Sequence, residues 1–305
     1  MNRCGYDTIR LKSENHPDSL SNIQDLTYHS KPGKSDWQTG YIGGMRISIH
    51  SQGTTIQGSL ASFLRGNNWL LASPQDASES LTKLSELLEL DLFQAKVARL
   101  DFAQDIVVDN RPHDYYPYLG IIPGKWTRRQ DRNTLYYDQI EKQLAIYDKI
   151  KQMAKEGHFL PPGIEAAFII RCELRLLKRA YNALKRPITG LSLTDPVIFD
   201  ELEAMHQKLF QGIPVVVPAK FDMRHTPLKE WKEQGLALAL QSIGLDEVKR
   251  QLSKPAGPET QAAKQTRYQK RRIAEGLMRK QLTKYPDTLA HELSHKIKTA
   301  GRKPL

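Results

Sequence analysis

The sequence has little cysteine and no long apolar run, and these two absences exclude several classes of protein. Among its 305 residues there are only two cysteines, Cys4 and Cys172. Two cysteines provide neither a disulfide framework nor a cysteine-based zinc site. No apolar stretch approaches the ~20 residues that cross a bilayer, and the first residues lack the apolar segment of a secretory signal. We therefore expect a protein of the reducing cytoplasm without a membrane partner.

Positive charge is concentrated at one end of the chain. The net charge is +11, and residues 254–305 contain 13 Lys or Arg against 4 Asp or Glu. The remaining 253 residues are nearly balanced, with 32 basic against 30 acidic side chains. Such a distribution is typical of a tail that binds a polyanion, although a simply solvated tail has the same composition.

Three stretches alternate apolar and polar residues at the two-residue period of a β-strand, namely 96–108, 143–150 and 171–176. Their polar sides carry Arg99, Asp101 and Asp105 in the first, Tyr147 and Lys149 in the second, and Arg171, Glu173 and Arg175 in the third. We predict an α+β fold, in which helices pack on one face of an antiparallel sheet and the other face is an open active-site face. A mostly helical C-terminal region follows the sheet.

Shorter patterns indicate the remaining elements and the domain boundaries. We expect strands at 6–12, 45–50, 54–58 and 134–137, helices at 59–64, 76–90 and 177–186, and loops at 13–36 and 110–133. His50, at the end of one expected strand, has the pattern of a surface residue. We divide the chain into a domain at 1–193, a helical region at 194–254 with helix candidates at 228–240 and 245–252, and a basic tail at 255–305 whose residues 260–285 form one long helix.

The expected loop at 110–133 interleaves aromatic residues with arginines. It contains Tyr115, Tyr116, Tyr118, Trp126, Arg128, Arg129 and Arg132. This mixture suits stacking on unpaired bases while phosphates are held. The alternative is that the aromatic rings pack against the edge of the sheet, and the pattern does not separate the two.

Several ordered motifs resemble the replication initiators of filamentous phages, the gene II and X proteins. They are Tyr6-Asp7-Thr8-Ile9, the run from Ile56 to Asn68, Arg99-Leu100-Asp101-Phe102-Ala103, Ile146-Tyr147-Asp148-Lys149 and Arg171-Cys172-Glu173-Leu174-Arg175-Leu176. The strand motifs are also similar to those of the Rep_trans plasmid initiators. The resemblance covers roughly residues 6–200, and the order of the motifs makes it more specific than any one of them.

The resemblance implies a rolling-circle initiator that nicks one strand of duplex origin DNA. A tyrosine becomes linked to the 5′ phosphate, the 3′ hydroxyl primes synthesis, and a later strand transfer religates the displaced single strand. A Mg²⁺ or Mn²⁺ ion would be held by Asp101 and Glu173, with Asp105 as third ligand. Structural ion pairs with neighbouring arginines are the alternative role for these acids. The nine histidines form no His-hydrophobic-His triplet, so a histidine-clamped metal is not expected.

Two tyrosines are candidates for the nucleophile. Tyr181 follows Glu173 by eight residues in an expected helix, as the reactive tyrosine does in the related plasmid initiators, and we prefer it. Tyr147 is second, on the polar side of its strand. We expect DNA to be bound by Lys149, Arg175, Lys178, Arg179, Arg128, Arg129, Arg267, Lys270, Arg271 and Arg272. A helicase of the bacterial host is the expected protein partner.

Two rival functions remain open. His291-Glu292-Leu293-Ser294-His295 fits the His-Glu-x-x-His pattern of zinc proteases, but it is crowded by lysines and few residues follow it. The other rival is a DNA-binding protein that does not cut, with the sheet as platform and the tail as anchor. Apolar residues of the tail, Ile273, Leu277 and Leu282, could instead pair two subunits into a homodimer.

Overall fold

A computed structural model describes residues 3–33, 35–157, 160, 164, 167–177, 184–216, 232–233, 235–236, 260–284 and 288–300. Its strands are β1 (Arg3–Ser13), β2 (Gln24–His29), β3 (Trp37–Ile42), β4 (Met45–His50), β5 (Gly53–Ser59), β6 (Lys96–Val108), β7 (Thr127–Asp131), β8 (Thr134–Asp138), β9 (Lys142–Asp148) and β10 (Phe168–Leu176). They form one ten-stranded antiparallel sheet in the order β2-β3-β4-β5-β1-β6-β10-β9-β8-β7. The predicted α+β fold is confirmed.

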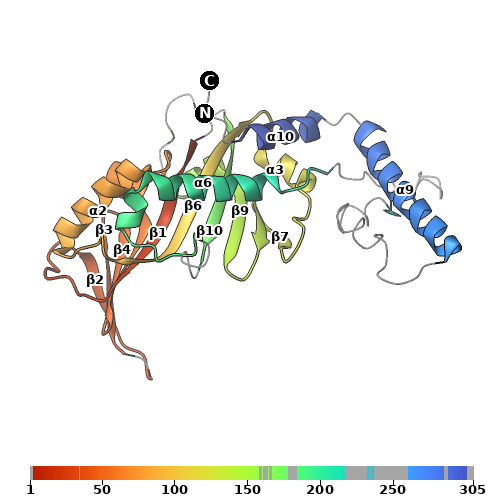
Figure 1. The fold of residues 1–305 in the computed structure, drawn as a ribbon. Helices are drawn as coiled ribbons and strands as arrows, with labels where there is room; N and C mark the ends of the chain where they lie inside the picture. The colour runs from red at the N-terminus through yellow and green to blue at the C-terminus, as the bar shows by residue number, and fades with distance from the viewer. Residues whose placement is uncertain are drawn as a thin grey trace.

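The helices lie between the strands and after them. They are α1 (Leu60–Arg65), α2 (Pro74–Leu88), α3 (Pro112–Tyr115), α4 (Lys149–Lys155), α6 (Pro196–Gln211), α9 (Gln261–Lys284) and α10 (Thr288–Thr299), with short 3₁₀ turns η1 (Tyr116–Tyr118) and η2 (Leu191–Thr194). In Figure 1, α6 crosses the sheet in front of its central strands, and α9 stands apart from the sheet. Among the described helices, none is long and apolar enough to cross a membrane.

Capping residues set the ends of the early helices. Ser59 accepts a hydrogen bond from the backbone of Ser62 at 3.3 Å and starts α1, which ends at Gly66 in the left-handed conformation with φ 74°. Ser73 and Asp76 form a reciprocal capping box at the start of α2. Ser59 and Gly66 are the signals from which α1 is predicted in the sequence, whereas α2 is predicted from the helical spacing of its leucines.

One face of the sheet is buried under helices. The central strand β6 turns Leu100, Phe102 and Ile106 toward this face, where all three are buried. Residues from α6 and α10 complete the same core, namely Leu202, Phe210, Leu293 and Ile297. The helix α6 lies at the start of region 194–254, which is expected to be helical. It therefore covers the sheet formed by the first 193 residues.

The two outermost strands differ from the expected loops. The structure has β2 within 13–36, and it has α3, η1 and β7 within 110–133. Most residues of β2 and β7 are exposed, so neither strand has the alternation of buried and solvated positions from which a strand is predicted. A smaller difference is that β9 ends at Asp148, whose side chain accepts from the backbone of Lys151 at 2.9 Å and caps α4. Lys149 thus begins a helix instead of continuing the strand to residue 150.

Candidate active-site face

The register of the three central strands brings the predicted acids to one face. Asp101 on β6 lies directly opposite Arg175 on β10, and Arg171 lies opposite both Asp105 on β6 and Tyr147 on β9. Directly opposed residues in antiparallel strands point to the same side of the sheet. These side chains therefore share the side opposite the helices, as the alternation in the sequence predicts.

Asp101 and Glu173 form a buried acid pair on this face. Their side chains are 1% and 3% exposed, and they share a hydrogen bond. Burial first, and then the charge of Glu173, raises the pKa of Asp101 to about 7. Burial also raises the pKa of Glu173, but Arg175, the hydrogen bond to Asp101 and the charge of Arg171 together outweigh it and lower that pKa. Asp101 is therefore the acid of the pair with the higher pKa.

Small residues flank Glu173 in its row across the sheet. Its direct neighbours are Ala103 on β6 and Ala145 on β9, and Gly5 on β1 opposes Ala103. Larger side chains would fill the space beside the carboxylate. Glu173 thus has small side chains on both sides in its row, and the adjacent rows contain Arg171 and Arg175.

An arginine two positions away on the same strand holds each member of the acid pair. Arg99 donates to Asp101 through Nε at 2.9 Å and Nη2 at 2.5 Å, and Arg175 donates to Glu173 at 2.7 Å. Both arginines are partly exposed, with side-chain values of 22% and 23%. The acids are therefore shielded from solvent by cations that a bound phosphate could also contact.

Asp105, the third predicted ligand, belongs to a separate ion cluster centred on Arg171. The Arg171 guanidinium is fully buried and donates to both oxygens of Asp105, at 2.6 and 2.7 Å, and to Asp7 at 3.3 Å. Its remaining contacts are the backbone carbonyls of Asn68 and Trp69, at 3.3 and 3.4 Å. The loop after α1 is thereby tied to the sheet face, which gives a structural reason for the Gly66-Asn67-Asn68 end of the motif.

Tyr147 lies beside this ion cluster, but it is firmly protonated. The side chain is buried, and burial together with the charges of Glu173 and Asp7 raises its pKa well above the usual value of 10. Arg171 opposes this effect but does not cancel it. Attack by Tyr147 would therefore require that its environment change when DNA arrives.

Tyr136, which the sequence does not single out, also lies on the acid face. Tyr136 on β8 lies opposite Ala145 on β9 and therefore shares the row of Glu173. The Arg129 guanidinium lies 4.0 Å from the centre of its ring, and that of Arg175 lies 6.0 Å away. Only the register of β8 against β9 shows this arrangement, because nothing in the sequence near 136 distinguishes this tyrosine from its neighbour Tyr137.

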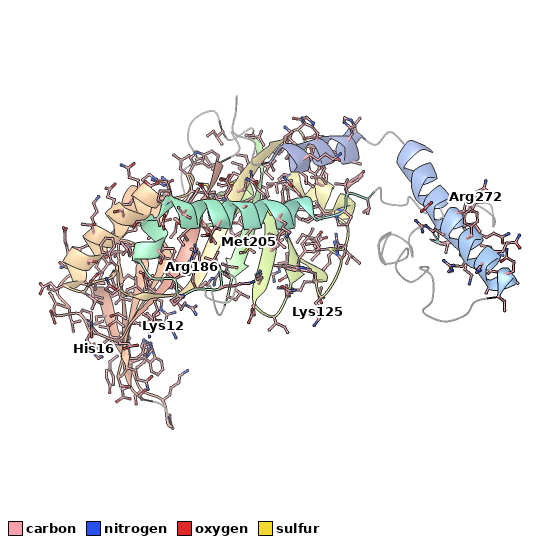
Figure 2. All side chains as sticks on the ribbon, in the orientation of Figure 1. Lys12, His16, Lys125, Arg186, Met205 and Arg272 are labelled. Carbon is pink, nitrogen blue, oxygen red and sulfur yellow. The ribbon has the colours of Figure 1, made fainter. Side chains whose placement is uncertain are left out.

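The cations predicted to bind DNA fall into three groups. The first group is Arg129 and Arg175, which lie on the acid face. The second group lies on α9, where Lys270, Arg271 and Arg272 are exposed and Arg267 is half-buried. Figure 2 labels Arg272 on this helix. Arg128 points to the helix-covered side and donates to the carbonyls of Leu119 and Tyr116 at 2.9 and 2.8 Å. Lys149 is completely buried and donates to Asn68 at 2.8 Å, and burial lowers its pKa to about 8.

Several predicted features lie outside the described residues. They are Tyr181, Lys178 and Arg179, the helix candidates at 228–240 and 245–252 apart from four described positions, and most of the helix expected at 177–186. The role of Tyr181 stays a prediction. For the aromatic loop, Tyr115, Tyr116 and Tyr118 are buried, so their rings pack into the protein and do not present a surface for stacked bases.

The acid pair fits a hard divalent cation better than Asp105 does. Two adjacent buried carboxylates offer oxygen ligands, and Mg²⁺ is commonly held by one or two carboxylates together with substrate phosphates. Both oxygens of Asp101 accept from Arg99, which is partly exposed and can turn toward a bound phosphate. Asp105 fits less well, because both of its oxygens accept from Arg171, which is fully buried. In the part of the chain that the structure describes, no three His, Cys, Asp or Glu side chains form a metal-binding group.

The His-Glu-x-x-His motif lies on α10, where Glu292 holds the helix against the sheet. Its carboxylate accepts from the backbone N–H of Asp109 at 2.8 Å and from the hydroxyl of Tyr115. Both histidines of the motif are exposed. A glutamate engaged in two structural hydrogen bonds is poorly placed to act as the base of a protease.

Comparison with known proteins identifies one family. The family described as the N-terminal part of a phage replication-associated protein matches residues 13–197, which is more than half of the chain. The matched segment contains β2 to β10 and therefore the acid pair, its two arginines, Arg171 and Asp105, while Asp7 on β1 lies before it. No curated protein matches the sequence.

Proposed function

Since this chain belongs to the filamentous-phage replication initiation family, we propose that it initiates replication by nicking one DNA strand with a tyrosine. Residues of the sheet face would bind origin DNA at the scissile phosphate. The tyrosine would remain linked to the 5′ phosphate, and the free 3′ hydroxyl would prime rolling-circle synthesis. Separation of the strands would be left to a helicase.

The observation that carries this proposal is the buried, adjacent pair Asp101–Glu173 beside Arg99 and Arg175. Buried carboxylates with shifted pKa values, placed on an otherwise polar sheet face, are typical of sites that do chemistry. The alternative of purely structural ion pairs explains the arginines, but it gives no reason why two acids should be buried side by side.

The proposed step is a transesterification at phosphorus. The phenolic oxygen attacks, the bond from phosphorus to the 3′ oxygen breaks, and the phenolic proton ends on the leaving 3′ oxygen, so atoms and charge balance. Arg175 and Arg129 hold phosphate oxygens and neutralise the charge that develops on them. Magnesium or manganese, held by Asp101 and Glu173, would supply Lewis-acid polarisation of the phosphate.

We assign the attack to Tyr181, with Tyr147 as the second candidate. The burial of Tyr147 and the negative charges around it keep its proton in place, which favours a different phenol as nucleophile. Tyr147 would then line the site and contact the bound strand. In this assignment the two tyrosines have different roles, so their variants should behave differently.

The test is to incubate the protein with supercoiled origin DNA and Mg²⁺ and to analyse the products by denaturing electrophoresis. We expect a nicked circle with protein attached to a 5′ end. Tyr181→Phe should abolish this adduct, while Tyr147→Phe should reduce its rate only. If Tyr147→Phe abolishes the adduct and Tyr181→Phe does not, the two roles are reversed.

Acid variants separate cleavage from binding. Asp101→Asn and Glu173→Gln should each lower nicking by about 100-fold or more, since a positioned metal or charge-stabilising group is worth several kcal/mol, while DNA affinity changes little. Glu79→Gln is the control, because Glu79 pairs with Lys83 on the exposed surface of α2 and contacts none of the residues assigned to the site. Salt-sensitive binding without any cleavage by the wild-type protein would favour the non-catalytic DNA-binding alternative.

A further inference from the structure

Three aromatic rings stand in a row on the outer strands of the sheet. His29 on β2 lies opposite Trp37 on β3, and Trp37 lies opposite His50 on β4. The ring centres of His29 and Trp37 are 5.1 Å apart with an angle of 18° between the planes, and those of Trp37 and His50 are 6.5 Å apart with an angle of 23°. We call His29, Trp37 and His50 the stacking row.

The stacking row lies on the same side of the sheet as the acid pair. Two further rows on this side lead toward the acid pair. The first is Thr39, Ser48, Thr55 and Lys12. The second is Tyr41, Arg46, Gln57 and Arg10, and Arg10 is opposite Arg99. Arg10 donates to Gln57 at 2.7 Å, and Arg99 holds Asp101. A continuous polar surface therefore leads from the candidate active site to the stacking row.

The charge around the stacking row suits a polyanion. Strands β3, β4 and β5 contain no Asp or Glu at all. Lys31 places its Nζ 5.9 Å from the centre of the Trp37 ring, and Arg46 and Lys12 are exposed on the same side, with Lys12 labelled in Figure 2. A ligand with phosphates and flat rings would meet cations and aromatic faces together.

His50 is the exposed end of the stacking row. Its in-register neighbour on β5 is Gly53, and the backbone of Ser13 and Glu14 lies within 2.1–2.9 Å of the position that a Cβ on Gly53 would take. His16 donates to the backbone carbonyl of His50 at 2.8 Å and fixes that end of β4. The exposed part of the His50 ring is therefore where a flat group would first meet the row.

We propose that the stacking row binds unpaired bases of single-stranded DNA on the same side of the sheet as the nicking site. The inference rests on the proposed function for the identity of the ligand. Cross-strand packing of the three rings stabilises the β2–β4 extension in either case. What points to a ligand is the combination of parallel rings, nearby cations, three strands without acids and continuity with the active-site face.

The test compares three variants in binding to a fluorescently labelled single strand of origin sequence. Trp37→Ala should weaken binding by about 5- to 100-fold, the range expected when one base loses its aromatic partner. Trp37→Phe should retain most of the affinity. Tyr28→Ala is the matched control, because Tyr28 belongs to the same hairpin, is 61% exposed and points to the opposite side, where it faces Gln38.

Salt dependence separates stacking from phosphate contacts. Trp37→Ala should leave the slope of log Kd against log salt unchanged, whereas Arg46→Gln should reduce it by about 1.

Trp37 fluorescence gives a readout that does not depend on the alanine variant folding. Addition of the single strand to wild-type protein should quench tryptophan emission, and Trp37→Phe should remove that quenching.

Four results would overturn the proposal. The first two are equal losses of affinity in Trp37→Ala and Tyr28→Ala, and unchanged affinity in Trp37→Ala. The third is quenching that persists in Trp37→Phe. The fourth is a lower sedimentation coefficient of Trp37→Ala than of the wild-type protein without DNA, which would mark the row as a contact between two copies. Failure of the nicking proposal looks different. If the wild-type protein never forms a 5′ adduct but Trp37 is still quenched, the stacking site stands and the nicking chemistry does not.

Discussion

At the scale of single residues, burial decides what each charge on the sheet face can do. Arg171 has no exposed surface and is surrounded by Asp105, Asp7 and two backbone carbonyls, so it cannot contact a substrate. Arg175, further along the same strand and on the same side, keeps part of its guanidinium in solvent. The first arginine therefore holds the face together, and the second is available for phosphate.

Replacing Arg171 should destabilise the protein severely. Arg171→Met would leave Asp105 and Asp7 without their shared cation, and loss of one partner of a buried pair costs about 3–5 kcal/mol. The measurement is the free energy of unfolding in urea. Lys83→Met is the control, because its pair with Glu79 is more than half exposed on both sides and should change stability by less than ~0.5 kcal/mol. Equal effects of the two substitutions would contradict this account.

His206 should make the folded protein sensitive to acid. Its Nε2 donates to the carbonyl of Cys172 at 2.9 Å, its ring is buried, and burial lowers its pKa to about 4. Between about pH 6.5 and pH 4 the unfolded chain binds a proton that the folded chain does not. Stability is therefore lost as the pH falls through this window, by about 1.4 kcal/mol for each unit of pKa difference.

The measurement is Tm as a function of pH for His206→Gln, whose amide can still donate to Cys172. Its Tm should fall less steeply than that of the wild-type protein between pH 6.5 and 4. His113→Gln is the control, because His113 is exposed on α3. Parallel curves for the wild-type protein and His206→Gln would show that His206 does not carry the acid sensitivity.

At the scale of elements, the sequence predicts those strands that have one buried face. β6, β9 and β10 pack Leu100, Ile146 and Leu174 against helices, and this burial produces the alternation that reveals them. β2 and β7 form the two edges of the sheet, where neither side is consistently buried. The sequence of β7, Thr-Arg-Arg-Gln-Asp, is polar throughout and has no periodic signal. β2 alternates Leu26 and Tyr28 with polar residues, but the run is short and both side chains are exposed.

The helix α10 is attached to the sheet through Glu292, and this predicts the effect of Glu292→Ala. The substitution leaves the backbone N–H of Asp109 and the hydroxyl of Tyr115 without their acceptor, which should cost about 1–3 kcal/mol in unfolding free energy. His291→Ala, on the exposed side of the same helix, should have no effect. If zinc raises Tm in the wild-type protein but not in His291→Ala, the motif binds metal and the structural account is wrong.

At the scale of the whole molecule, the candidate site could be predicted only in part. The resemblance to phage initiators and the strand period identify Asp101 and Glu173 on one face. Asp105 is separate from them because it pairs with Arg171. The loop that carries Asn68 and Trp69 holds Arg171 in this position through its backbone carbonyls. That contact joins residues that lie 103 and 102 positions apart in the sequence, and no local pattern near residue 68 or residue 171 indicates it.

The distribution of charge over the molecule leads to a prediction for α9. Lys270, Arg271 and Arg272 are exposed on this helix, which stands apart from the sheet in Figure 1. If α9 lies along duplex phosphates, replacing all three by Gln should reduce the slope of log Kd against log salt by up to about 3, because each phosphate contact contributes roughly 0.9. Nicking of a short single strand should not change, since the sheet face is untouched.

The same helix exposes Ile273, with 54% of its surface accessible. A variant at this residue can therefore distinguish a helix that binds DNA from a helix that pairs two subunits. If α9 pairs two chains, Ile273→Ser should lower the sedimentation coefficient of the free protein, and the triple Gln variant should not. If α9 binds duplex, the triple variant should lose salt-dependent affinity for duplex while Ile273→Ser retains it. Charge and apolar surface lie on one helix, so this pair of variants tests which of the two the molecule uses.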